Sequence, residues 1–231
     1  MTANSKGRCV GLIGGLGVGA AVHYYQELFK AHEAAGISMQ LQMAHADMHR
    51  GLRYVQAGEL GELARYLAEL IGRLKAGGAE MAVIPAFTPH ICIAELVPIS
   101  PLPLVNILEV IGEEVRARKY RRLALFGTRF TIESRLFGHL KDVELVLPKP
   151  EELDSIHAMY FQLASTGAGS EEQRTRLTKL AHTLIERENL DAIVLAGTDL
   201  SLVFNESNTD FPHMDCSRLH IDAIMHRVLG G

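Results

Sequence analysis

The chain has 231 residues, of which 48% are hydrophobic and 22% are charged, which is typical of a globular protein with a sizeable core. Its formal net charge is −4, and no block of lysine and arginine exceeds Lys119 to Arg122, so we expect no nucleic-acid partner. Three scattered cysteines without a CxxC pair argue against a disulfide framework or a zinc site. The apolar runs are too short to span a bilayer and no signal-peptide core is seen, so we expect a cytoplasmic protein without a membrane partner.

Short apolar runs alternate with longer segments of helical periodicity, which predicts an α/β fold with mostly parallel sheets. The predicted strands, in chain order, are Cys9–Ile13, Ser38–Ala44, Met81–Pro85, Leu123–Gly127, Glu144–Leu147 and Ala192–Ala196. The predicted helices are Ala20–Ala35, Glu59–Ala76, Ile107–Arg118, Ile132–Leu140, Glu151–Leu163, Ser170–Glu188 and Cys216–Val228.

The two halves of the chain have a similar outline. MAVIPAFT follows Glu80, and AIVLAGTD follows Asp191, in two predicted strands. This similarity indicates a duplicated α/β unit, although any two buried parallel strands read as similar apolar runs. Pro98, Pro101 and Pro103 interrupt the middle of the chain and predict a lobe boundary or a crossover there. We therefore predict a first lobe of residues 1–103 and 210–231 and a second lobe of residues 104–209.

A glycine-rich loop, GLIGGLGVGAA, joins the first predicted strand to the first predicted helix. Gly15, Gly17 and Ala20 satisfy the loose dinucleotide pattern GxGxxG/A, and amides at a helix N-terminus attract anions. The same amides could hold a small carboxylate. The structural alternative is a tight turn in which glycine permits close packing and a positive φ.

Five stretches of the chain carry a family resemblance. They are GLIGGLGVGAAVHYYQEL at the start, IPAFTPH (84–90), FGTRFTIESRLF (126–137), LAGTDL (195–200) and DCSRLHIDAI (215–224). Together and in order, they resemble the motifs of the aspartate/glutamate racemase superfamily of cofactor-independent racemases, isomerases, decarboxylases and lyases. The resemblance implies two pseudo-symmetric α/β lobes that face each other across a cleft. It also implies a role in amino acid metabolism, no cofactor, and a homodimer as one oligomeric state.

The chain departs from this family at the reacting residues. In the family, two cysteines flank the substrate α-carbon, and one removes a proton that the other replaces on the opposite face. The matching positions are Ala86 and Gly197, so we expect no two-thiol racemisation. Phe87 stands where the family has asparagine, which removes an amide donor and narrows the site.

Other motif positions keep groups that suit binding of a small anion. In the family, hydroxyls and strand-end amides at such positions bind the substrate carboxylates. The positions that we expect to contact substrate are Gly15, Gly17, Phe87, Thr88, Thr128, Thr131 and Thr198.

Three sets of residues could replace the missing thiols in acid–base chemistry. His90 has a side chain that titrates near neutral pH, and its alternative role is to tie down a loop. Asp199 replaces the family's glutamate, and its alternative role is to cap a helix. His45, Asp47 and His49 alternate as H-x-D-x-H, which on a strand would place all three on one side as a base, a ligand clamp or a metal site.

The structural alternative for the H-x-D-x-H segment is the end of a strand that enters a solvated loop. We assign no metal to this segment. Arg50 and Arg53, which follow it, could bind a carboxylate or lie at the surface. Cys216, beside Asp215 before a predicted helix, is a further nucleophile candidate because a helix N-terminus lowers a thiol pKa.

Three functional hypotheses remain open on this basis. The first is an isomerase or lyase that acts on a small amino-acid-like or dicarboxylic acid with non-standard acid–base groups, His90, Asp199 or His45. The second is a non-catalytic protein that binds a small anion or has a regulatory role. The third, which rests on the glycine loop alone, is a nucleotide-binding oxidoreductase.

Overall fold

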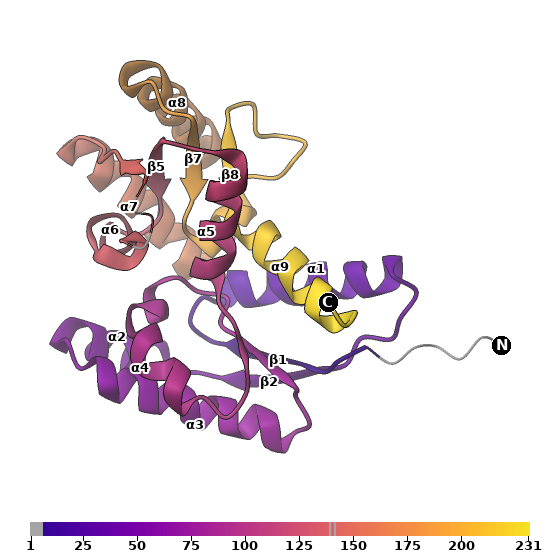
Figure 1. Ribbon diagram of the computed structural model, residues 1–231. Coiled ribbons are helices and arrows are strands. Elements are labelled where there is room, and N and C mark those ends of the chain that lie inside the picture. Colours follow the sequence, from indigo (N-terminus) through magenta and orange to yellow (C-terminus); the bar gives the residue numbers. More distant parts are fainter. Residues whose placement is uncertain (1–6, 139, 141) are drawn as a thin grey trace.

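Two four-stranded sheets, in which all paired strands are parallel, organise the chain (Figure 1). The computed structural model describes residues 7–138, 140 and 142–231. The first sheet has the strand order β2-β1-β3-β4 and the second has the order β6-β5-β7-β8. The same arrangement of four successive strands therefore occurs twice, which confirms the predicted α/β fold with two lobes.

The first half of the described chain contains β1 (Val10–Gly14), α1 (Val18–Ala34), β2 (Leu41–His45), α2 (Met48–Ala57), α3 (Leu60–Ala76), β3 (Met81–Val83), η1 (Thr88–Cys92), α4 (Ile93–Leu96), η2 (Val97–Ile99), β4 (Leu104–Val105) and α5 (Ile107–Arg118). The second half contains β5 (Arg122–Phe126), α6 (Arg129–Glu133), η3 (Arg135–Phe137), β6 (Glu144–Leu145), α7 (Pro150–Thr166), α8 (Glu171–Glu188), β7 (Ala192–Leu195), η4 (Thr198–Leu202), β8 (His213–Asp215) and α9 (Cys216–Val228). Elements labelled η are single 3₁₀ segments.

The last helix of each half packs against the other half. Side chains of α5 join the core of the second sheet, and side chains of α9 join the core of the first sheet. Figure 1 shows α9 lying beside α1 over β1 and β2. The predicted lobe boundaries differ from the sheet pairing at two short strands, because β4 belongs to the first sheet and β8 to the second. Both strands are too short for a periodic signal.

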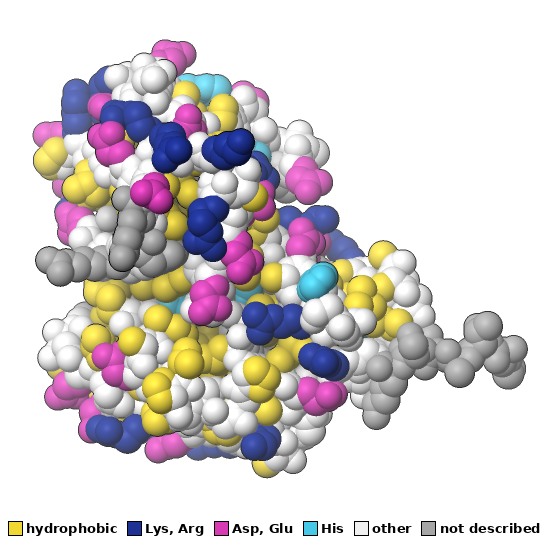
Figure 2. All heavy atoms as spheres, in the orientation of Figure 1, with side chains coloured by type: hydrophobic (Ala, Val, Ile, Leu, Met, Phe, Trp, Pro, Cys, Tyr) yellow, Lys and Arg dark blue, Asp and Glu magenta, His cyan; other side chains and the backbone are white. Residues whose placement is uncertain are grey.

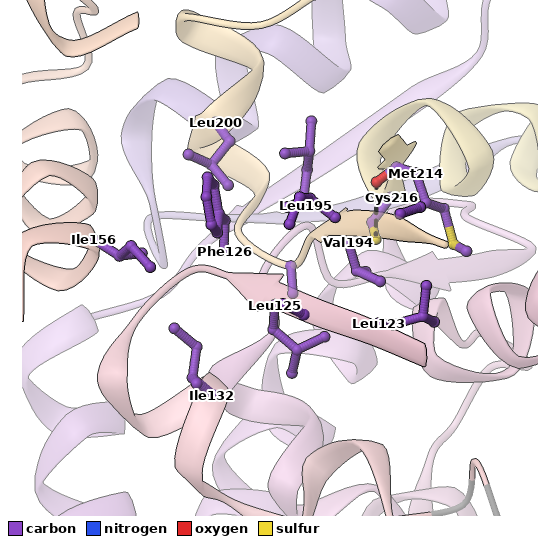
Figure 3. Close-up of a cluster of buried hydrophobic side chains, with 14 of the residues drawn as sticks. Leu123, Leu125, Phe126, Ile132, Ile156, Val194, Leu195, Leu200, Met214 and Cys216 are labelled. Carbon is purple, nitrogen blue, oxygen red and sulfur yellow. Dashed lines mark hydrogen bonds between the residues drawn. The ribbon is translucent and has the colours of Figure 1, made fainter. Parts of the chain in front are cut away.

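The central strands are buried on both faces, which explains their unbroken apolar sequences. In the second sheet, every residue of β7 is buried, and so are the last four of β5. Figure 3 shows Phe126, Leu195 and Leu200 converging in the core of this lobe. Such strands lack the alternation of half-buried strands because helices cover both faces of a parallel sheet.

The structure differs from the predicted helices at one predicted helix and at one helix that was not predicted. The predicted helix Ile132–Leu140 is replaced by the short α6 and η3, and position 139 lies outside the described residues. Helix α2 was not predicted. Its N-terminus is set by Asp47, whose carboxylate accepts hydrogen bonds from the backbone N–H groups of His49 and Arg50.

In the described part of the chain, no helix combines the length and apolarity needed to cross a membrane.

A buried tyrosine–histidine pair fastens α1 to α9 and β4. The Tyr24 hydroxyl lies 3.0 Å from His220 Nδ1, and His220 Nε2 lies 2.8 Å from the carbonyl oxygen of Val105. The Val105 carbonyl can only accept, so Nε2 carries the proton and Nδ1 accepts from Tyr24. Both side chains are fully buried.

Replacing Tyr24 with phenylalanine is expected to lower the free energy of unfolding by about 1–3 kcal/mol, because it leaves His220 Nδ1 buried without a donor. Urea unfolding of the variant measures the loss. Tyr25→Phe is the matched control, since Tyr25 is 47% exposed and should change stability little. Equal effects of the two substitutions would contradict the assigned role of the pair.

Candidate functional site

A cavity of about 140 Å³ lies where segments that follow strands of the two sheets come together. Ligands of parallel α/β proteins bind beyond the carboxyl ends of the strands, because loops and helix N-termini converge there. We call it the central cavity. Its lining residues are Leu16, Met48, Gly51, Leu52, Val55, Leu63, Ala86, Phe87, Thr88, Pro89, Thr128, Thr131, Tyr160, Phe161, Ala164, Ser165, Thr198 and Asp199.

Most of the wall of the central cavity is apolar. Helix α2 contributes Met48, Leu52 and Val55, and Phe161 stands on α7 in the other half of the chain. Figure 2 shows hydrophobic side chains gathered on the lower lobe over α2 and α4. The lining residues that the structure describes include no lysine, arginine or histidine. A ligand in this cavity therefore meets no cationic side chain of the lining.

Four threonine hydroxyls supply much of the polar lining. Thr128 caps α6 by accepting a hydrogen bond from the Thr131 N–H at 3.0 Å, and the two threonine hydroxyls lie 2.9 Å apart. One of these two hydroxyl protons stays free, because a single O–H···O bond uses only one. The Thr198 hydroxyl donates to the carbonyl oxygen of Pro85 at 3.0 Å. The Thr88 hydroxyl makes no hydrogen bond to another described residue and can donate into the cavity.

Asp199 is the one carboxylate among the described lining residues, and it joins the two halves of the chain. Its Oδ1 accepts a hydrogen bond from the backbone N–H of Ala20 at 3.0 Å, and its Oδ2 accepts one from the Tyr160 hydroxyl at 3.1 Å. Burial raises the pKa of Asp199, and the hydrogen bonds from Tyr160 and Ala20 act in the opposite direction. Burial and the neighbouring Asp199 charge raise the pKa of Tyr160 well above its usual value, so the phenol stays protonated at neutral pH.

The glycine loop is shaped to receive this carboxylate. A Cβ added at Gly17 or at Gly19 would lie 3.0 Å from an oxygen of Asp199. The anion at the N-terminus of α1 is therefore a side chain of the protein itself, which argues against the dinucleotide interpretation. Gly17 is not among the described residues that line the central cavity. Gly15 has φ of +86° and its added Cβ would lie 2.3 Å from the Ala46 carbonyl oxygen, so it serves a tight turn instead of lining the cavity.

The two positions that match the family's cysteines differ in their surroundings. Ala86 lines the central cavity, whereas a Cβ at Gly197 would lie 2.1 Å from Cε2 of Tyr160. The tyrosine ring thus occupies the space that a side chain at position 197 would need. Phe87 lies in the wall as expected, packed against Phe137 with ring centroids 5.7 Å apart.

The histidines that we expected to act as acid–base groups lie elsewhere. His90 is buried, its Nδ1 lies 2.8 Å from the Ala86 carbonyl oxygen, and burial lowers its pKa to about 4. It belongs to a separate hollow beside Asn106, so it ties down the loop that carries Ala86. His45 is exposed at the end of β2 and lies over Gly15. Neither histidine is among the described residues of the central cavity.

The H-x-D-x-H segment does not continue as a strand. The strand ends at His45, Asp47 is the N-cap of α2, and His49 lies inside that helix. Among the residues that the structure describes, no three His, Cys, Asp or Glu side chains are grouped so that they could hold a metal ion. The Arg50 guanidinium stacks 4.4 Å from the centre of the Tyr66 ring instead of facing the cavity.

Two of the three thiols, those of Cys92 and Cys216, are buried. Burial raises the pKa of Cys92 to about 12, and it raises the pKa of Cys216 well above its usual value. Thiolates are the nucleophilic form, so neither residue suits covalent or proton-transfer chemistry near neutral pH.

Sequence reasoning missed Tyr160 because a tyrosine inside an amphipathic helix gives no signal beyond its place on the buried face.

Comparison with known proteins identifies the family and the fold of the chain. A sequence profile of the Asp/Glu/hydantoin racemase family matches residues 13–224. A candidate Asp/Glu racemase from Yersinia pestis superposes with a TM-score of 0.81 at 22% identity, over 96% of this chain and 99% of that one. An aspartate racemase homologue from Pyrococcus horikoshii superposes with a TM-score of 0.81 at 20% identity, over 96% of this chain and 99% of that one. The aspartate racemase of Picrophilus torridus superposes with a TM-score of 0.69 at 18% identity, over 96% of this chain and 94% of that one.

Proposed function

Because the chain belongs to the Asp/Glu/hydantoin racemase family, we propose that it acts on a small carboxylic acid in the central cavity, with Asp199 as the proton acceptor. The observation that carries this proposal is the position of Asp199. It is a buried carboxylate that lines the cavity and that Tyr160 and Ala20 hold from either side. Burial raises its pKa above that of an ordinary aspartate, which favours a general base.

The threonine hydroxyls would receive the substrate carboxylate. Thr88 and the Thr128–Thr131 pair each have a proton available for donation. When Asp199 takes the proton next to the carboxylate, the electrons of the C–H bond move into the carboxylate and increase the charge on its oxygens. Hydrogen bonds from the hydroxyls become stronger at that moment, which lowers the barrier. Tyr160 keeps Asp199 oriented by its hydrogen bond.

Proton transfer in this site would occur on one face of the substrate. Asp199 and Tyr160 are the titratable residues among the described lining, and η4 and α7 of the second lobe carry them. The first lobe contributes Leu16, Leu63 and Ala86 to the lining, and these side chains have no proton to exchange. Racemisation through two groups on opposite faces therefore lacks its second group. A lyase, or proton exchange with retained configuration, fits the site better.

We expect Asp199→Asn to slow α-proton exchange at least about 100-fold, equivalent to about 3 kcal/mol, because an amide is a far weaker base than a carboxylate. Proton NMR in deuterated water, with both enantiomers of a panel of small acids, measures exchange, and chiral chromatography reports configuration. Asp222→Asn is the matched control, since this carboxylate lies on α9 and is 59% exposed. Exchange that survives in Asp199→Asn, or that racemises the acid, would contradict the proposal.

One observation favours a second candidate, a protein that binds a small anion without turnover. Each oxygen of Asp199 already accepts a hydrogen bond, so the carboxylate could serve only to join the lobes. In that case an acid should raise the melting temperature by mass action but remain unchanged after long incubation. Line broadening without exchange in the same NMR experiment would support this candidate.

A further inference from the structure

We infer that the central cavity takes an acid with one carboxylate and a small apolar side chain, in preference to a dicarboxylate such as an acidic amino acid. The inference rests on the proposed function, in which the cavity binds a carboxylic acid. It concerns the substituent that does not react, and it follows from the composition, the charge and the size of the wall.

The polar groups of the cavity suffice for one carboxylate. The free hydroxyl protons are those of Thr88 and one of the Thr128–Thr131 pair, whereas the hydroxyl proton of Thr198 is used by the Pro85 carbonyl. Ser165 supplies a further hydroxyl, but it donates to the carbonyl oxygen of Phe161 at 2.7 Å. A second carboxylate would find no cationic side chain in the described lining to replace its lost hydration.

The charge of Asp199 disfavours a second carboxylate in addition. Two carboxylates confined in one small site repel each other, and one of them must take up a proton to stay there. A substrate with a single carboxylate, held at the threonines, meets this repulsion once, whereas a dicarboxylate meets it with both of its charged groups. An α-amino group is compatible with the site, because its positive charge is attracted to Asp199.

The remaining wall is shaped for an apolar group. Met48, Leu52 and Val55 project from successive turns of α2, and Leu63 and Phe161 complete the apolar surface. The volume of about 140 Å³ is close to the roughly 150 Å³ of a dry apolar cavity that admits benzene. The side chain of the acid is therefore expected to be no larger than a few carbon atoms.

Two matched pairs of acids test the inference directly. Valerate and glutarate have the same five-carbon chain and differ in one terminal group, a methyl or a carboxylate, and norvaline and glutamate differ in the same way. Isothermal titration with the full chain is expected to show valerate binding at least about 10-fold more tightly than glutarate, and norvaline more tightly than glutamate. Thr88→Val, which removes a free hydroxyl without changing the volume, should weaken every acid that binds.

A second test of the inference introduces a positive charge into the apolar wall of the central cavity. Leu52 is 37% exposed, so an arginine there can keep its stem on the apolar wall and place its cation at the edge of the cavity. Leu52→Arg should raise the affinity for glutarate at least about 10-fold and lower that for valerate, while Leu52→Met should keep the original preference.

The outcomes separate the inference from the proposed function. Tighter binding of glutarate and glutamate by the unmodified chain, weakened by Thr88→Val, would overturn the inference and leave the carboxylic-acid site intact. Absence of binding by all four acids, or binding that Thr88→Val leaves unchanged, would overturn the proposed function and the inference with it.

Discussion

Lowering the pH from 7 to 5 is expected to reduce the free energy of unfolding by about 4 kcal/mol, because two buried histidines must stay neutral in the folded chain. Burial lowers the pKa of His90 to about 4 and that of His220 to about 3. An unfolded histidine has a pKa near 6.5, so below that pH the unfolded chain binds protons that the folded chain does not. Each histidine then costs about 1.4 kcal/mol per pH unit, or about 2 kcal/mol at pH 5.

Protonation of Asp199 changes the free energy of unfolding in the opposite direction to protonation of the two histidines. Burial raises the pKa of that carboxyl group, so its protonation favours the folded state and offsets a small part of the loss at low pH. The histidine contribution is fully present above pH 6.5 and is lost as the pH falls toward the folded pKa values.

Urea unfolding at several pH values between 7 and 5 measures this loss of stability, and NMR titration of the imidazole protons identifies the residues responsible. The matched control is His49→Gln, because His49 is exposed on α2 and meets water in both states. Its curve should follow that of the unmodified chain. Unchanged stability down to pH 5, or protonation of His220 in the folded chain near pH 6.5, would contradict the prediction.

Replacing Gly197 with alanine is expected to destabilise the fold by about 3 kcal/mol, because the new methyl group would lie 2.1 Å from Cε2 of Tyr160. The ring cannot retreat freely, since its hydroxyl is bound to Asp199 and its side chain is buried. Gly197→Cys should cost at least as much. The position that matches a family cysteine can therefore regain a thiol only if Tyr160 is removed.

A double-mutant cycle in urea measures this dependence. Tyr160→Ala makes room at position 197, so Gly197→Ala in that background should lose about 2–3 kcal/mol less than it does alone. Gly72→Ala, inside α3, is the control glycine because nothing lies within 4 Å of its added Cβ, and it should be neutral or slightly stabilising. Additive losses at positions 197 and 160 would show that the ring does not occupy this space.

The sequence by itself determined the elements whose signal is local. Helical periodicity predicted α3, α5, α8 and α9 to within a few residues, since each buries one face of a regular helix. Runs of apolar residues predicted the buried parallel strands. The order of the motifs predicted the two-lobed fold, and several hydroxyl residues of the central cavity, Thr88, Thr128, Thr131 and Thr198, were also found from sequence.

Local sequence patterns gave a wrong prediction where the same residue spacing is compatible with two different local structures. His45, Asp47 and His49 alternate as on a strand, yet Asp47 caps α2, because a capping aspartate and a strand aspartate look the same without their partners. His90 carries a titratable ring in a motif position, yet burial holds its pKa at about 4. Burial depends on what packs over a residue, which a single sequence does not contain.

Only the tertiary structure decided what the glycine loop holds and what replaces the side chain at position 197. Asp199 and Ala20 are 179 residues apart, and Tyr160 reaches Asp199 across 39 residues. Such contacts depend on how the two lobes and their helices are placed, whereas periodicity reports only on neighbours within a few turns. The sequence therefore specifies the lobes, and their packing specifies which side chains line the central cavity.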